Sequence, residues 1–158
     1  MGLKRAFVIG LCLAAVAAVV MLAAVIIRPP KIYISEICPS NSETSKKTAM
    51  QDKNGEPSDW IEIYNPTNKD ISLTGFSLSK NGGGDQPLGG YVIKAHDYII
   101  VYCSSAGFEN ADFPHADFSI GKVSEAEIIL KYDSLQCESI KLPKLNKGVS
   151  FSKNVKGE

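Results

Sequence analysis

Two hydrophobic patterns divide the chain. Residues 6–27 form one apolar run of 22 residues without a charge, whereas the rest alternates short apolar runs with polar turn sequences. As a helix, the long run would extend about 33 Å at 1.5 Å per residue, enough to cross the hydrocarbon core of a bilayer. The pattern therefore predicts one N-terminal transmembrane helix followed by a separate folded part.

The short apolar runs of the second part are typical of β-strands. They are rich in β-branched and aromatic residues and are bounded by turn residues. They predict strands at residues 31–37, 59–65, 71–80, 91–93, 98–103, 116–120, 126–132, 137–142 and 148–153. Gly75, inside the third run, indicates a bulge or a close backbone approach. Because no helical pattern alternates with these runs, we expect an antiparallel all-β sandwich rather than a parallel α/β fold.

The flanks of the long apolar run indicate its orientation. Lys4 and Arg5 precede it, which favours a cytoplasmic N-terminus and an outward C-terminal part. Cleavage as a signal peptide is the alternative, but Ile26 and Ile27 stand where a cleavage site requires small residues. The expected organisation is a cytoplasmic segment at residues 1–5, a transmembrane signal anchor at 6–28 and an extracytoplasmic domain at 29–158.

The charge distribution disfavours nucleic acid as a partner. The chain has 17 basic and 17 acidic residues, but three of the basic ones, Lys4, Arg5 and Arg28, flank the apolar run. The outer part therefore carries 14 lysines against 17 acidic residues, a net charge of −3, and no arginine. Arginine is the residue best suited to reading base edges and clamping phosphates. We read the basic stretch at residues 141–158 as solvated surface.

Three cysteines, Cys38, Cys103 and Cys137, lie outside the apolar run. An odd number without a CxxC spacing is not a closed disulfide framework. We expect three small, half-buried apolar side chains, with one disulfide as the alternative.

The stretch "SDWIEIYNPTNKDISLTGFSL" at residues 58–78 carries the most specific pattern. In a strand, Trp60, Glu62 and Tyr64 share one face, and Ile61 and Ile63 share the other. The Asn-Pro that follows favours a turn, because an asparagine side chain can bond nearby backbone groups. The pattern predicts a strand leading into a pinned corner.

Several blocks of the chain together resemble the lamin tail domain, an immunoglobulin-like β-sandwich. The blocks are "ISEICPSN", "DWIEIYNP", "LTGFSLS", "YIIVYCSS" and "EIILKY", in the order expected for the family, and the resemblance covers residues 31–153. It is closest to the bacterial type found beside secreted enzymes and spore-coat protein H-like kinases. The resemblance implies a non-catalytic binding or spacer module. It also assigns a structural motif to Asp59, Trp60, Glu62, Asn65, Pro66 and Gly75.

The chain departs from the family pattern in two places. A short glycine-rich stretch replaces the usual tryptophan strand, and Lys94 and His96 stand where proline and glycine are common. Both departures fall in turns, so the fold is still expected. No coiled-coil rod is present, so the nuclear role of eukaryotic lamins does not follow from the resemblance.

Catalytic chemistry finds little support in the sequence. Asp59 and Glu62 are three residues apart on a strand, so they point to opposite faces and do not form an acid–base pair. His96 lies in a turn and His115 in an expected loop, and we expect no nucleophile partner near either of them. We therefore expect no catalytic residue, no cofactor and no enzyme activity in this chain.

One loop offers candidate metal ligands. Asp52, Asn54, Glu56 and Asp59 are oxygen-bearing residues, and Gly55 between them favours a turn. Calcium prefers such loops, although the EF-hand pattern is incomplete and lacks its terminal glutamate. A plain hydrophilic turn is the alternative.

These patterns lead to two hypotheses of function. The first is a membrane-anchored, outward-facing sandwich that recognises a protein or a cell-surface polymer through its loops or an exposed strand edge. The alternative is the N-terminal accessory domain of a larger surface enzyme, such as a spore-coat kinase-like protein. A catalytic domain elsewhere in a longer protein would distinguish the second from the first.

Overall fold

The chain divides into two compact units, Met1–Pro30 and Lys31–Glu158. The structure, a computed structural model, describes residues 28–41, 50–52, 55–104, 113–121 and 125–153. The expected anchor at residues 6–28 lies outside the described residues except for Arg28. Within those ranges, no helix is both long and apolar enough to span a bilayer.

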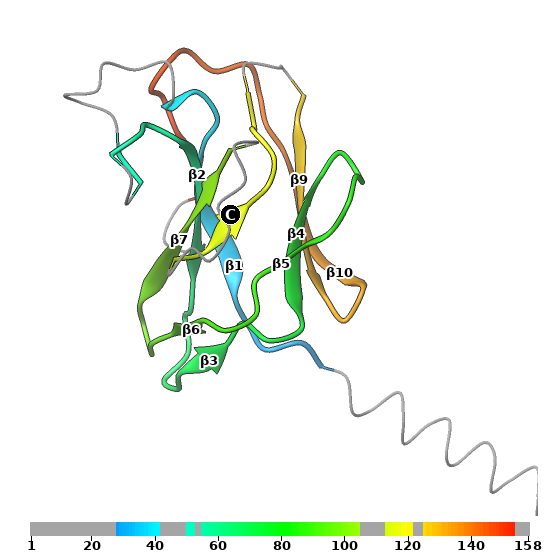
Figure 1. The fold of residues 1–158 in the computed structure, drawn as a ribbon. Coiled ribbons are helices and arrows are strands. Elements are labelled where there is room, and N and C mark those ends of the chain that lie inside the picture. Colours follow the sequence, from blue (N-terminus) through cyan, green and yellow to red (C-terminus); the bar gives the residue numbers. More distant parts are fainter. Residues whose placement is uncertain (1–27, 42–49, 53–54, 105–112, 122–124, 154–158) are drawn as a thin grey trace, which may run out of the picture. The chain divides into compact units, whose positions relative to one another are not determined.

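The described part of the second unit is all-β (Figure 1). Its strands are β1 (Tyr33–Cys38), β2 (Asp59–Tyr64), β3 (Ile71–Ser72), β4 (Phe76–Lys80), β5 (Gln86–Pro87), β6 (Val92–Ile93), β7 (Tyr98–Cys103), β8 (His115–Ala116), β9 (Glu127–Tyr132), β10 (Leu135–Lys141) and β11 (Phe151–Ser152). Each run predicted from the sequence overlaps at least one of these strands.

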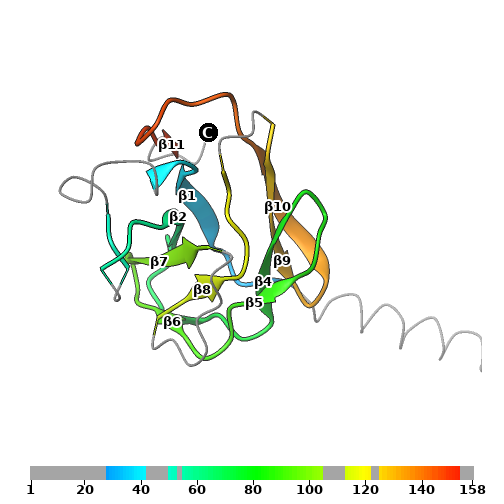
Figure 2. The same ribbon diagram turned by 45° about the horizontal axis from the view of Figure 1, so that its top comes forward.

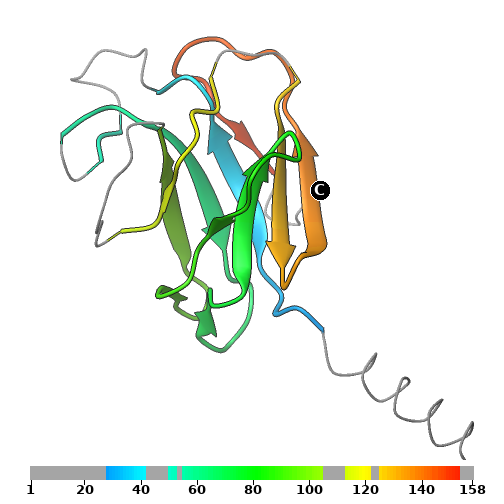
Figure 3. The ribbon, with the colours of Figure 1, turned by 45° about the vertical axis from the view of Figure 1, so that its right-hand side comes forward.

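The strands form two main sheets and a small one. The five-stranded sheet has the order β11-β1-β2-β7-β8, and the four-stranded sheet has the order β10-β9-β4-β5 (Figure 2). A two-stranded sheet joins β3 and β6. The two main sheets face each other as layers (Figure 3), an arrangement consistent with an immunoglobulin-like β-sandwich.

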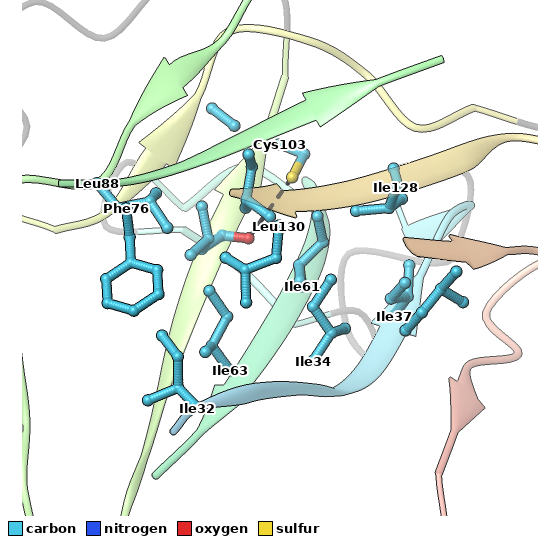
Figure 4. Packing of buried hydrophobic residues seen from close by; sticks show 14 of the residues in the cluster. Ile32, Ile34, Ile37, Ile61, Ile63, Phe76, Leu88, Cys103, Ile128 and Leu130 are labelled. Carbon is cyan, nitrogen blue, oxygen red and sulfur yellow. Dashed lines mark hydrogen bonds between the residues drawn. The ribbon is translucent and has the colours of Figure 1, made fainter. Parts of the chain in front are cut away.

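The core lies between the two main sheets (Figure 4). Ile61 and Ile63 of β2 are fully buried in it, so the alternation predicted for this strand is correct. Leu78 of β4 and Leu130 of β9 enter the same core from the opposite sheet. Burying a branched aliphatic side chain of this size contributes about 2 kcal/mol, which makes this layer the main source of stability.

The strand expected at residues 71–80 is two strands, so this prediction was wrong. Leu73 accepts a hydrogen bond from the amide of Phe76 at 2.9 Å, which closes a turn between β3 and β4. Gly75 has a φ of 86° at the third position of that turn, where type II turns require a positive φ. The chain therefore turns at Gly75 and passes from the small sheet into the four-stranded sheet.

The structure differs from the prediction also in its short strands and in the direction of one strand pairing. The glycine-rich turn contains β5, and Pro87 fits there because an edge strand tolerates its missing amide. The strand expected at 116–120 is only β8, which begins at His115 rather than following a loop. β8 also pairs with β7 in parallel, so the sandwich is not wholly antiparallel.

Glu138 of the edge strand β10 connects the two main sheets. Its register partner Leu130 is a core residue, so the carboxylate points toward the interior of the sandwich. One oxygen accepts a hydrogen bond from the amide of Ile34 in β1 at 2.7 Å, and the other is paired with Lys153. A bulge at Cys137 lies beside this contact. The half-buried charge is thus both paired and hydrogen-bonded.

The three cysteines are free thiols. Cys38 and Cys103 are buried, and burial raises the pKa of both thiols. Cys137 is exposed, so the expectation of three half-buried side chains was wrong: two are buried and one is exposed. Glu138, the neighbour of Cys137, points toward the interior, so Cys137 lies on the opposite face of β10.

Candidate functional site

Asn65 holds together the corner that follows β2. The side chain is fully buried, and its amide nitrogen lies 2.8 Å from the carbonyl of Lys69 and 2.9 Å from that of Lys94. Its oxygen accepts hydrogen bonds from both the amide and the hydroxyl of Thr67, at 2.9 and 2.8 Å. One side chain therefore supplies hydrogen-bond partners to backbone groups where two loops meet. Buried polar groups in loops need such partners, because no β-ladder satisfies them.

At the other end of β2, Asp59 likewise holds a neighbouring segment in place through hydrogen bonds. It is 1 % exposed and shares the inner face with Ile61. One carboxylate oxygen accepts a hydrogen bond from the hydroxyl of Ser119 at 3.1 Å and another from the amide of Gly121 at 2.9 Å. The carboxylate therefore ties the segment after β8 to the end of the core. Hydrogen bonds to an ionised acceptor are stronger than those between neutral groups.

The other motif residues differ from one another in role. Trp60 is 8 % exposed, although it lies on the outer face of its sheet opposite Tyr102. Pro66 is half-buried and follows the end of β2. Gly75 has a φ of 86°, and an added Cβ would lie 2.9 Å from the carboxylate of Asp133, so a side chain there would be strained.

Glu62 lies on the outer face beside a second glutamate. The register of β1 and β2 places Glu36 directly opposite it. The hydroxyl of Ser35 donates to the Glu62 carboxylate at 2.5 Å, and the hydroxyl of Ser150 donates to that of Glu36. Sequence reasoning missed this pairing, because the bulge between Ile34 and Glu36 shifts the register.

The candidate calcium ligands do not converge within the described residues. The two oxygens of Asp52 accept hydrogen bonds from the amide of Glu56 and the hydroxyl of Ser58, both at 3.1 Å. The Asp59 carboxylate instead binds Ser119 and Gly121, as described above. Asn54 lies outside the described residues. Across the described ranges, no group of three His, Cys, Asp or Glu residues has a geometry suited to a metal ion.

Each histidine has a polar neighbour. His96, with a φ of 56°, has its Nε2 2.5 Å from the side-chain oxygen of Asn68. His115 has its Nε2 3.3 Å from the hydroxyl of Ser104, so the expectation that no nucleophile lies nearby was wrong. The amide of Ser104 also donates to the carbonyl of Ala116 at 3.2 Å. The serine–histidine contact therefore lies beside the ladder that joins β7 and β8, where it ties the two strands together.

Burial governs the protonation of His115. It lowers the pKa of the imidazole, while the charges of Asp117 and Asp52 act in the opposite direction. A pair whose hydroxyl and ring nitrogen are separated by 3.3 Å is long for an O–H donor. Its geometry is that of a structural contact between neighbouring strands.

The sandwich and its internally bonded polar corners define an immunoglobulin-like β domain. A family model, the Lamin Tail Domain, matches residues 28–141, more than half of the 158-residue chain. The chain therefore belongs to the lamin tail domain family, as its motif blocks predicted. A comparison with curated proteins gave no match.

Proposed function

We propose that the chain is a non-catalytic interaction module, held in a membrane by residues 6–27, whose β-sandwich binds a protein or a cell-surface polymer outside the cytoplasm. Membership of the lamin tail domain family supports the interaction role. The uncharged apolar run after Lys4 and Arg5 supports the anchor and its orientation.

The observation that carries this proposal is the use made of the buried motif residues. The polar side-chain atoms of Asp59 and Asn65 are hydrogen-bonded to backbone and hydroxyl groups of the same chain. Groups occupied in this way hold loops in place and are not available to a substrate. The motif therefore builds a rigid scaffold, and recognition falls to the loops and outer surfaces, as in other sandwich domains.

Topology is the first part to test. Protease added to intact cells is expected to degrade the sandwich, while the same protease leaves a cytoplasmic marker uncut. Full protection of residues 31–158 in intact cells, with cleavage only after permeabilisation, would contradict the orientation.

Partner capture tests the rest. Photo-crosslinkers placed singly at exposed sandwich positions, such as Val92 and Tyr98 (50 % and 57 % exposed), are expected to give discrete higher-mass bands from intact membranes. A crosslinker at the buried Leu78 serves as the control and is expected to give none. Absence of any discrete adduct across all exposed positions would argue against an interaction module.

A further inference from the structure

The outer face of the five-stranded sheet carries two rows of side chains that the proposed function has not yet used. Strand register places Tyr33, Tyr64 and Tyr98 side by side across β1, β2 and β7. The adjacent row across the same strands contains Glu36, Glu62 and Ile100. We call these six residues the tyrosine–glutamate face. Because Ile61 and Ile63 enter the core between the two sheets, these alternate positions lie on the side of the sheet turned away from β4, β9 and β10.

The face contains an uncompensated pair of like charges. Like charges directly opposite each other on neighbouring strands destabilise a sheet. Among the described residues, Glu36 and Glu62 are each bonded to a serine hydroxyl, and neither forms an ion pair with a lysine or arginine. The arrangement thus costs stability in the unbound chain, and a cation bound between the two carboxylates would offset that cost.

The tyrosines beside the glutamates suit the same kind of ligand. Tyr98 is 57 % exposed, while Tyr33 and Tyr64 are half-buried and form an edge-to-face pair with centroids 5.6 Å apart and planes at 61°. The negative faces of aromatic rings attract ammonium and guanidinium groups. Carboxylates give such groups charge-assisted hydrogen bonds. Rings tilted by 61° do not form the flat platform on which successive sugar rings would stack.

We propose that the tyrosine–glutamate face binds a lysine- or arginine-bearing segment of a protein partner, with a cationic side chain seated between Glu36 and Glu62. This inference rests on the proposed function, because it names the surface and the partner chemistry of the same interaction module. The net charge of −3 on the part of the chain after Arg28 favours the approach of a cationic partner.

The test uses the full chain in detergent micelles and a fluorescent peptide of alternating lysine and glycine. Binding is measured by anisotropy at low salt, with the same peptide acetylated on every lysine as the ligand control. The double variant Glu36→Gln, Glu62→Gln removes both charges but keeps an acceptor for each serine. Glu127→Gln is the matched protein control, because Glu127 is also a strand glutamate bonded to a serine hydroxyl, 2.5 Å from Ser139.

The expected result is saturable binding of the lysine peptide that weakens at least tenfold in the double variant and changes less than twofold in the control. The acetylated peptide is expected not to bind. Tyr98→Ala is expected to weaken binding several-fold without altering the fold. Equal affinity of the double variant and Glu127→Gln, or no binding of the lysine peptide, would overturn the proposal.

Crosslinking separates failure of this inference from failure of the proposed function. The double variant is expected to lose the adducts that the otherwise wild-type chain forms from exposed crosslinker positions outside this face in intact membranes. If those adducts persist unchanged, or contain a polysaccharide, the chain remains an interaction module but the cationic-segment proposal is wrong. If the wild-type chain forms no adducts at any exposed position, the interaction role itself fails.

Discussion

The two ends of β2 and its middle use polar residues in opposite ways. At the ends, Asp59 and Asn65 are buried, and their polar atoms are bonded within the chain. In the middle, Glu62 faces outward and lies opposite Glu36, a residue of the same charge. The same seven-residue block "DWIEIYN" therefore contains groups that stabilise the fold and a group that works against it.

This difference indicates which residues maintain the fold and which are available for binding. A buried polar group that is fully hydrogen-bonded specifies one arrangement of the chain, and its removal leaves its partners unsatisfied. A like-charged pair on a surface stabilises nothing in the free protein. Substitutions at the two kinds of position should therefore change the free energy of unfolding in opposite directions.

The largest expected effect is at Asn65. Asn65→Ala removes a fully buried side chain bonded to Thr67, Ile93 and Lys94, and the carbonyl of Ile93 loses a buried donor. We expect the free energy of unfolding of residues 31–158 to fall by about 3 kcal/mol. Denaturant titration followed by Trp60 fluorescence would measure it. Asn68→Ala, in the same loop but exposed, is the control, and an equal loss there would contradict the role of Asn65.

A smaller loss is expected at Gly75, which extends the comparison to the turn before β4. Gly75→Ala would place a Cβ 2.9 Å from the Asp133 carboxylate at a positive φ, and we expect a loss of roughly 2 kcal/mol. Gly84→Ala is the matched control, because the space around its Cβ is open. Thermal unfolding of both variants would show it; similar melting temperatures would mean that the turn adapts without strain.

At Glu62 we expect a substitution to raise the free energy of unfolding rather than lower it. Glu62→Gln relieves the repulsion from Glu36 and keeps an acceptor for Ser35, so we expect a gain of roughly 0.5 kcal/mol. Glu127→Gln should instead cost about 0.5 kcal/mol, because its register partner is the oppositely charged Lys141. Urea midpoints of the two variants measure the difference. Loss of stability in both would mean that Glu62 supports the fold in the same way as Asn65.

A pH-dependent effect is expected at His115. Burial lowers the pKa of its imidazole below the usual 6.5, so the folded state favours the neutral ring. The corresponding stability is present above pH 6.5 and is lost as the pH falls through the lowered pKa. Unfolding measured from pH 7.5 to 5 should therefore show a steeper fall for the wild type than for His115→Gln. Parallel curves would exclude this contribution.

The smallest effect is expected from calcium. Because Asp52 and Asp59 are bonded to groups of the chain, a chelator should change the melting temperature of residues 31–158 by less than about 1 °C. A decrease of many degrees, restored by added calcium, would show that the loop at residues 52–59 is a metal site. Magnesium would serve as the control cation.

Alternation within a strand made much of the fold predictable. The inward Ile61 and Ile63, and the outward Glu62 between them, follow from a period of two. The break at Gly75 did not, because a glycine within an apolar run fits both a bulge and a turn. The parallel pairing of β8 with β7 was also unpredictable. It depends on the path by which the chain returns to β7 and not on the identity of His115 and Ala116.

The site was predictable only where its contacts are local. The bond of Asn65 to Thr67 follows from a spacing of two residues and the proline between them. The bond of Asp59 to Gly121 spans 62 residues, and the pairing of Glu36 with Glu62 depends on a one-residue bulge. A bulge changes the register without leaving a sequence signal. Cross-strand neighbours beyond a bulge therefore cannot be assigned from the sequence.

The contacts of Glu138 with Ile34 and Lys153 also bear on how copies of the protein behave when they are close together. β10 is the edge of its sheet, and an uncovered edge is a template for pairing with a strand of another copy. The bulge at Cys137 interrupts that template in its middle, because an added strand would meet an irregular backbone, and an inward-pointing charge such as Glu138 is a further feature of protected edges. This edge is therefore protected against pairing with a strand of another copy.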